Sequence, residues 1–113
     1  MNILELIEKA DQALAEAENL VLNDYETSVT FFRSGITKLC QAYLLSQKQT
    51  EFPEDLLILF QKCLVVNSEF EEIAVEFELF FGAIVVKEDP EILIDIVNEI
   101  WDFIVDLIPE FEG

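Results

Sequence analysis

The stretch from residue 25 to residue 45 constrains the fold most strongly, because it is apolar on more than one face of a helix. Its main apolar stripe recurs at the 3.6-residue helical period and comprises Val29, Phe32, Ile36, Leu39, Cys40 and Tyr43. Outside this stripe lie Phe31, Gly35, Ala42 and Leu45. A helix with apolar residues on two sides is usually packed on two sides. We therefore predict a central helix around which the other elements are arranged.

Apolar periodicity and helix-breaking residues predict four more helices, at residues 2–21, 53–66, 68–86 and 89–108. The chain has only three Gly and three Pro, which favours long helices over strands and turns. Pro53 is expected in the first turn of its helix, and Asp89 followed by Pro90 marks the clearest start. Capping boxes are expected at Asn23 with Glu26 and at Ser68 with Glu71. The predicted fold is an all-α, antiparallel up-down bundle of about five helices, one domain over residues 1–113.

The net charge of −18 is the most unusual bulk property, with 24 acidic residues, six basic residues and no His. It is uneven, since residues 1–62 contain ten acidic and five basic residues, whereas residues 63–113 contain fourteen acidic residues and one Lys. Such a field repels phosphate backbones and attracts basic proteins. We expect no direct binding to nucleic acid. The acidic surface is interpreted either as a docking surface for a basic protein or as a solvated surface that confers solubility.

The absence of His excludes Ser-His-Asp and Cys-His nucleophile systems. Cys40 and Cys63 are 23 residues apart with no CxxC motif, so we expect two buried reduced thiols and no zinc site. No glycine-rich phosphate loop is present. We therefore expect no enzyme activity, no catalytic residue, no metal and no cofactor.

The longest uncharged apolar run, residues 79–86, is far shorter than the roughly 20 residues that a membrane span needs. The first nine residues contain acids within the apolar run and no basic region before it, unlike a signal peptide. These features predict a cytoplasmic protein without membrane association.

The helix predicted after Pro90 carries acidic residues at i, i+4, i+7 and i+11, which are Asp95, Glu99, Asp102 and Asp106. Like charges at these spacings repel one another on a helix. This acidic stripe is either a docking surface for something basic or the solvated face of an otherwise apolar helix. The apolar faces exceed what one small bundle covers, which predicts a homodimer through the second, fourth or fifth helix.

The segment that begins at Tyr25 resembles the HEPN family of small helical bundles. In that family a Tyr-led helix carries a pattern close to Gln-Ala-x-Glu-Lys-x-x-Lys-Ala-Leu-Leu, and the next helix starts with Pro-x-x-Asp-Leu. The matching residues here are Lys38, Ala42, the Leu44-Leu45 pair and the run Pro53-Glu54-Asp55-Leu56. Thr37 and Gln41 depart from the pattern, and the Arg-then-His motif of the family's ribonucleases is absent because the chain has no His. The resemblance implies a non-catalytic member, similar to partners of minimal nucleotidyltransferases or to proposed nucleotide-binding modules.

Arg33 and Lys38 are two of the six basic residues, and both fall in the central helix. They are interpreted either as contacts to a nucleotide phosphate or as side chains that extend to surface acids. Three functions follow from the sequence. The first is an interaction module that binds a protein partner such as a nucleotidyltransferase or a basic toxin. The second is a nucleotide-binding module that uses Arg33 and Lys38, and the third is an acidic decoy that imitates nucleic acid.

Overall fold

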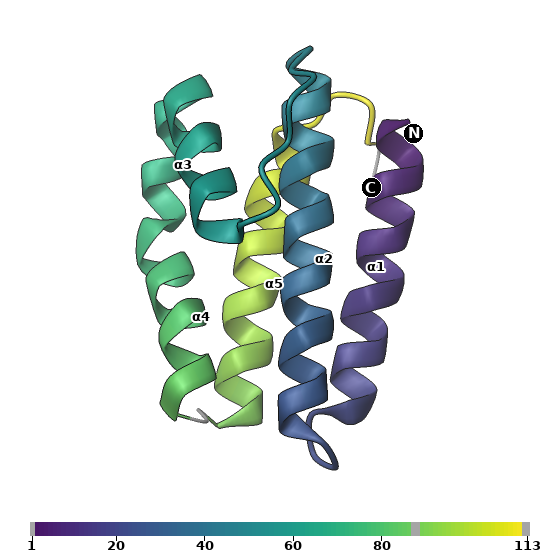
Figure 1. Cartoon of the computed structure of the whole chain (residues 1–113), viewed down its shortest axis with the longest axis vertical. Helices are drawn as coiled ribbons and strands as arrows, with labels where there is room; N and C mark the ends of the chain where they lie inside the picture. The colour runs from purple at the N-terminus through teal and green to yellow at the C-terminus, as the bar shows by residue number, and fades with distance from the viewer. Residues whose placement is uncertain (1, 87–88, 112–113) are drawn as a thin grey trace.

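Five α-helices and one 3₁₀ segment follow one another in the computed structural model, which describes residues 2–86 and 89–111 (Figure 1). They are α1 (Ile3–Leu20), α2 (Tyr25–Ser46), α3 (Leu56–Val66), η1 (Ser68–Ile73), α4 (Ala74–Val86) and α5 (Pro90–Asp106). No strand occurs within those described ranges. The predicted all-α bundle of five helices is confirmed.

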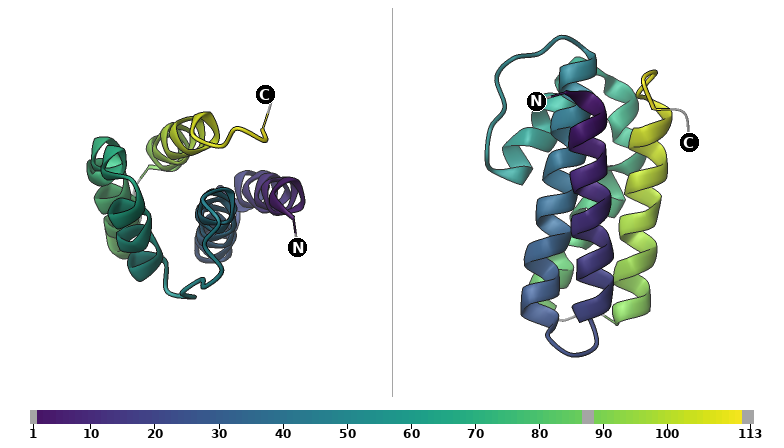
Figure 2. Two further views of the ribbon diagram at one scale, coloured as in Figure 1. Left: turned by 90° about the horizontal axis from the view of Figure 1, so that it is seen from above. Right: turned by 90° about the vertical axis from the view of Figure 1, so that its right-hand side faces the viewer.

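Helix α2 lies at the centre of the bundle, with α1 on one side and the α3, η1 and α4 segment on the other (Figures 1 and 2). Helix α5 runs antiparallel to α4 and also packs against α2. Helix α1 packs chiefly on α2 and meets α5 only loosely. The prediction of a central second helix is therefore confirmed.

The start of α2 is capped by Asp24 rather than by the predicted capping box of Asn23 and Glu26. The carboxylate of Asp24 accepts hydrogen bonds from the Thr27 backbone N–H at 3.2 Å and from the Thr27 hydroxyl at 2.6 Å. The side-chain bond from Thr27, and then the backbone bond, lower the pKa of Asp24. The prediction failed because Asp24, with Thr27 three residues later, satisfies the free N–H groups from one residue further along the chain.

Two predicted helix starts are also wrong. Helix α3 begins at Leu56 because Asp55 caps it, accepting a 3.1 Å hydrogen bond from the Ile58 N–H, so Pro53 precedes the helix. The segment after Asn67 is a 3₁₀ helix and not the first turns of α4. Asn67 accepts a side-chain bond from the N–H two residues later and a backbone bond from Phe70 N–H at 3.1 Å. These short-range bonds favour the tighter i to i+3 winding.

The predicted start of α5 is confirmed, with Asp89 as the N-cap and Pro90 in the first turn. The Asp89 side chain accepts a 2.8 Å hydrogen bond from the Glu91 N–H. Proline suits this position because its missing N–H would have no partner inside the helix.

Helices α1 and α2 are in direct contact at Gly35. A Cβ atom added to Gly35 would lie 2.6 Å from Cδ2 of Leu14 and 3.1 Å from the backbone oxygen of Ala10. Ala10 and Ala17 are fully buried on the same side of α1. Small residues on both helices therefore allow the two backbones to approach closely.

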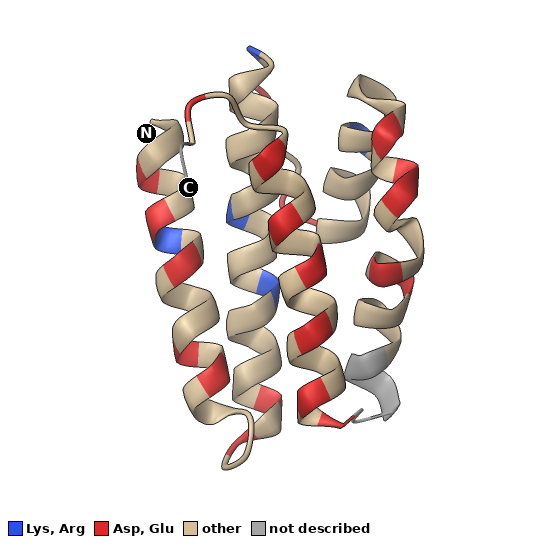
Figure 3. Ribbon diagram, turned by 180° about the vertical axis from the view of Figure 1, so that it is seen from behind, with Lys and Arg blue, Asp and Glu red and all other residues tan. Residues whose placement is uncertain are grey.

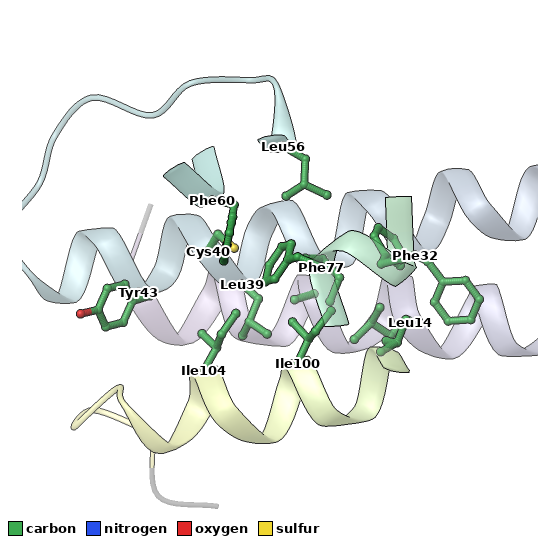
Figure 4. Close-up of a cluster of buried hydrophobic side chains, with 14 of the residues drawn as sticks. Leu14, Phe32, Leu39, Cys40, Tyr43, Leu56, Phe60, Phe77, Ile100 and Ile104 are labelled. Atoms are coloured by element: carbon green, nitrogen blue, oxygen red, sulfur yellow. The ribbon is translucent and has the colours of Figure 1, made fainter. Parts of the chain in front are cut away.

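The core on the other side of α2 is rich in aromatic side chains (Figure 4). The rings of Phe60 and Phe77 stack with centroids 4.1 Å apart, which joins α3 to α4. Phe70 of η1 is fully buried and lies 4.8 Å from Tyr43 and 5.5 Å from Phe103. The 3₁₀ segment is thus anchored to both α2 and α5. Within the described residues, none of the helices combines the length and apolar character needed to cross a bilayer.

Candidate functional site

Arg33 and Lys38 do not converge on a cleft. Both side chains are half-buried on α2, and five residues of helix place them about 140° apart around its axis. The Lys38 ammonium donates a 2.6 Å hydrogen bond to the hydroxyl of Ser34, one turn earlier on the same helix. Neither residue lines any of the hollows described below. Their role in nucleotide binding stays a prediction.

The acidic stripe of α5 is exposed along its whole length, and Figure 3 shows acidic positions following this helix and recurring on α1. Asp102 and Asp106 line a hollow of about 460 Å³ together with Trp101, Val105 and Phe111. Asp95 and Glu99 line none of the hollows described here. The structure thus places Asp102 and Asp106 beside a hollow, whereas Asp95 and Glu99 are exposed residues of the same helix.

Two more hollows adjoin Trp101 on its other side, where α5 faces α1. One of about 290 Å³ is lined by Leu4, Ile7, Glu8, Asp11, Trp101 and Phe111. The next, of about 160 Å³, is lined by Asp11, Leu14, Ala15, Glu18, Asn98 and Trp101. Because Trp101 lines all three hollows, they lie next to one another around this side chain, along the α1–α5 line. We call these three adjoining hollows the Trp101 groove.

The floor of the Trp101 groove is apolar, and its lips are acidic. The floor consists of Leu4, Ile7, Leu14, Trp101, Val105 and Phe111. The lips carry Glu8, Asp11 and Glu18 on the α1 side and Asp102 and Asp106 on the α5 side, all exposed. No Lys or Arg is among the residues that line these three hollows.

Local helix geometry explains why these residues line one strip. Asp11 and Glu18 are seven residues apart, which is close to two helical turns, so both face α5. Leu4 lies a further seven residues before Asp11. At the far end, Trp101 packs edge-on against Phe111 with ring centroids 6.3 Å apart. The Phe111 N–H donates a 3.1 Å hydrogen bond to the Ile108 carbonyl, which closes the turn that places Phe111 beside Trp101.

The remaining reactive side chains offer no second site. Cys40 and Cys63 are buried free thiols, as predicted, with the Cys63 Sγ 4.0 Å from the Cys40 carbonyl oxygen. Within residues 2–86 and 89–111, no three His, Cys, Asp or Glu side chains converge so that they could hold a metal ion. On α4, one carboxylate oxygen of Glu76 is buried and accepts no hydrogen bond from the described residues. Glu76 lines none of the hollows along the Trp101 groove.

No family model, curated protein or solved structure significantly matches this chain. The resemblance to the HEPN family therefore stays a prediction that rests on its short sequence patterns.

Sequence reasoning found one lip of the groove and missed the other. Asp102 and Asp106 are among the predicted site residues, whereas Glu8, Asp11 and Glu18 of α1, which line the hollows that also include Trp101, are not. Trp101 is not among the predicted site residues either. The sequence signal for the α1 side of the groove is the seven-residue spacing of Asp11 and Glu18, which places both beside the apolar stripe of α1.

Proposed function

We propose that this protein is a non-catalytic interaction module that binds a basic protein partner through the Trp101 groove. The observation that carries the proposal is an apolar floor between two acidic lips, with no basic residue in the lining. Apolar surface supplies the affinity of most protein–protein contacts, and complementary charge speeds encounter and selects the partner. The resemblance to the HEPN family supports a non-catalytic member whose partner is a protein such as a minimal nucleotidyltransferase, and the acidic charge is equally suited to a basic toxin. We place the protein in the cytoplasm.

A pair of matched variants tests this function. Asp102→Asn with Asp106→Asn removes two charges that line the groove, whereas Asp95→Asn with Glu99→Gln removes two from the same helix outside it. Each tagged protein is used to capture partners from a nuclease-treated lysate of the source organism, and the columns are washed at low and then moderate salt. We expect a stoichiometric basic protein that is retained by the parent protein and by the Asp95/Glu99 variant. The Asp102/Asp106 variant should retain much less of it.

Other outcomes would point to the alternative functions. Equal loss of the partner from both variants would mean that the whole acidic field binds it, as expected for a nucleic-acid-mimicking decoy. An empty column combined with an ATP- or GTP-dependent thermal shift, abolished in an Arg33→Ala, Lys38→Ala variant, would favour the nucleotide-binding module. Either result would overturn the proposal that the groove binds a basic protein.

We further propose that the chain forms a homodimer through the outer surface of α3 and α4. This surface exposes five large apolar side chains, namely Leu57, Ile58, Val65, Val75 and Leu79. Helix α3 contains no acidic residue, whereas α4 carries Glu76 and Glu78, so repulsion between two copies is smallest along α3. The α3–α4 side is opposite α1 and therefore leaves the Trp101 groove open (Figure 2).

The dimer is tested by sedimentation at several protein concentrations. Val65→Glu with Leu79→Glu places two charges in the proposed interface and should give a monomer. Leu22→Glu is the control, because Leu22 is 83% exposed, similar to Val65 at 86%, but lies between α1 and α2. A monomeric parent protein, or an unchanged dimer in the double variant, would contradict this interface.

A further inference from the structure

We infer that the segment bound in the Trp101 groove is a cationic amphipathic α-helix of about four turns. This inference rests on the proposed function and specifies the chemistry of the partner. It follows from the length of the groove, from the hydrogen-bonding groups in its lining and from the placement of charge on its two lips.

The length of the groove sets the length of the helix. Along α1 the lining extends from Leu4 to Glu18, fourteen residues at 1.5 Å each, or about 21 Å. Along α5 it extends from Asn98 to Asp106, about 12 Å, and Phe111 in the turn that follows α5 continues it. A partner helix of about 14 residues covers the roughly 21 Å of the α1 side. A shorter helix would leave part of the apolar floor exposed to water.

The lining favours a helix over an extended peptide. Helices α1 and α5 form most of the lining, their backbone N–H and C=O groups are used internally, and no sheet edge is available there. Among the side chains of the lining, only the Asn98 amide and the Trp101 indole N–H can donate a hydrogen bond, and the carboxylates only accept. An extended peptide would place unpaired backbone groups on an apolar floor, whereas a helix satisfies them internally.

Charge on both lips determines where the partner must be basic. A helix that lies along the groove meets Asp11 and Glu18 of α1 toward its Asn98 end and Asp102 and Asp106 of α5 toward its Phe111 end. Its apolar residues must therefore form one stripe, flanked on both sides by Lys or Arg. A second copy of this chain does not meet this requirement, since it has six basic residues against 24 acidic ones. Phosphate-bearing ligands are disfavoured at the groove for the same reason.

Designed peptides provide a direct test with the full-length protein. The first is a fluorescein-labelled peptide of about 15 residues, with leucines at i, i+3, i+4 and i+7 spacing and lysines on both flanks. The second has the same composition in an order that disperses the leucines around the helix. The third is the first peptide with a central proline, which breaks the helix. Binding is followed by fluorescence anisotropy, and helix content by circular dichroism with the unlabelled peptides.

We expect the first peptide to bind at least about tenfold more tightly than either control and to gain helix content on binding. The Asp102→Asn, Asp106→Asn variant should weaken its binding about 3- to 20-fold, and the Asp95→Asn, Glu99→Gln variant less than about twofold. These variants change only exposed side chains, so both should stay folded.

Equal affinity for the amphipathic and dispersed peptides would overturn the helix inference, because charge alone would then explain binding. The same would follow if the proline peptide bound as tightly as the first. Neither result would contradict the proposed function, which fails only if the lysate experiment gives no groove-dependent basic partner. The two proposals are therefore tested separately.

Discussion

Replacing each of the two helical glycines with alanine should have opposite effects on stability. Gly35 lies within α2, where an added Cβ would be 2.6 Å from Cδ2 and 2.7 Å from Cγ of Leu14. Gly82 lies within α4, where an added Cβ would meet no atom of the described residues within 4 Å. The same chemical change is therefore a steric conflict at one site and an unobstructed addition at the other.

The expected magnitudes follow from two opposing terms. In a helix interior, alanine is more favourable than glycine by about 1 kcal/mol. At Gly35 this gain is opposed by overpacking, which costs about 1–3 kcal/mol. The upper value applies because the backbone oxygen of Ala10, 3.1 Å from the new Cβ, closes the direction away from Leu14. We expect Gly35→Ala to destabilise by about 2 kcal/mol and Gly82→Ala to stabilise by about 1 kcal/mol. For a chain of this size, that difference corresponds to roughly 12 °C in Tm.

The measurement is chemical denaturation followed by circular dichroism at 222 nm, with thermal unfolding as a second readout. A Gly35→Ala, Leu14→Ala double variant completes a mutant cycle, because trimming Leu14 removes the conflict. The cycle should give a coupling energy above about 1 kcal/mol. A Gly35→Ala protein as stable as the parent would refute the close α1–α2 contact. A destabilised Gly82→Ala protein would refute the open environment of that glycine.

Two further predictions concern ionisable groups. Asp24→Ala should lower Tm, whereas Asp24→Asn should largely retain the cap at neutral pH. Because hydrogen bonds from Thr27 lower the pKa of Asp24, its contribution is present above the unfolded-state value of about 4 and is lost as pH falls through the lower folded-state pKa. An acid titration of stability that is identical in the parent and the Asp24→Asn protein would contradict this reasoning. The hydrogen bond with Cys63, and then burial, raise the pKa of the Cys40 thiol well above its ordinary value of 9.0. Ionisation of Cys40 should therefore leave the free energy of unfolding unchanged below about pH 9 and lower it above that pH. Cys40→Ala should reduce this loss of stability with rising pH. Rapid modification of Cys40 by a thiol reagent in the native protein at pH 7 would refute its burial.

The helices of this protein could be predicted because their apolar periodicity is long and their breaks are short. The starts of α3 and α4 could not be predicted in the same way. Pro53 and Asp55 both suit a helix start, and only the structure shows that the Asp55 carboxylate meets the Ile58 N–H. The 3₁₀ segment after Asn67 is anchored by Phe70, which is buried against Tyr43, a contact between residues far apart in sequence.

The candidate site was predictable only in part, because it is a property of two helices rather than one. The spacing of Asp102 and Asp106 places them on one face of α5, but it cannot show that this face adjoins a groove. That knowledge requires the position of α1, whose Asp11 lies beside Trp101 in the same hollow. Helix-wheel reasoning assigns each acid to a face of its own helix and carries no information about its neighbour.

The position of α1 also explains why the groove exists. Gly35 and Ala10 allow α1 to approach α2 so closely that its buried stripe is satisfied mainly by α2. Helix α5 packs on α2 from another side, with Ile100 and Ile104 fully buried. Both helices pack on α2, and long side chains such as Trp101 fill the space between them. Hollows remain on either side of the Trp101 side chain. Close packing at Gly35 therefore stabilises the bundle and, through the placement of α1, also sets the width of the Trp101 groove.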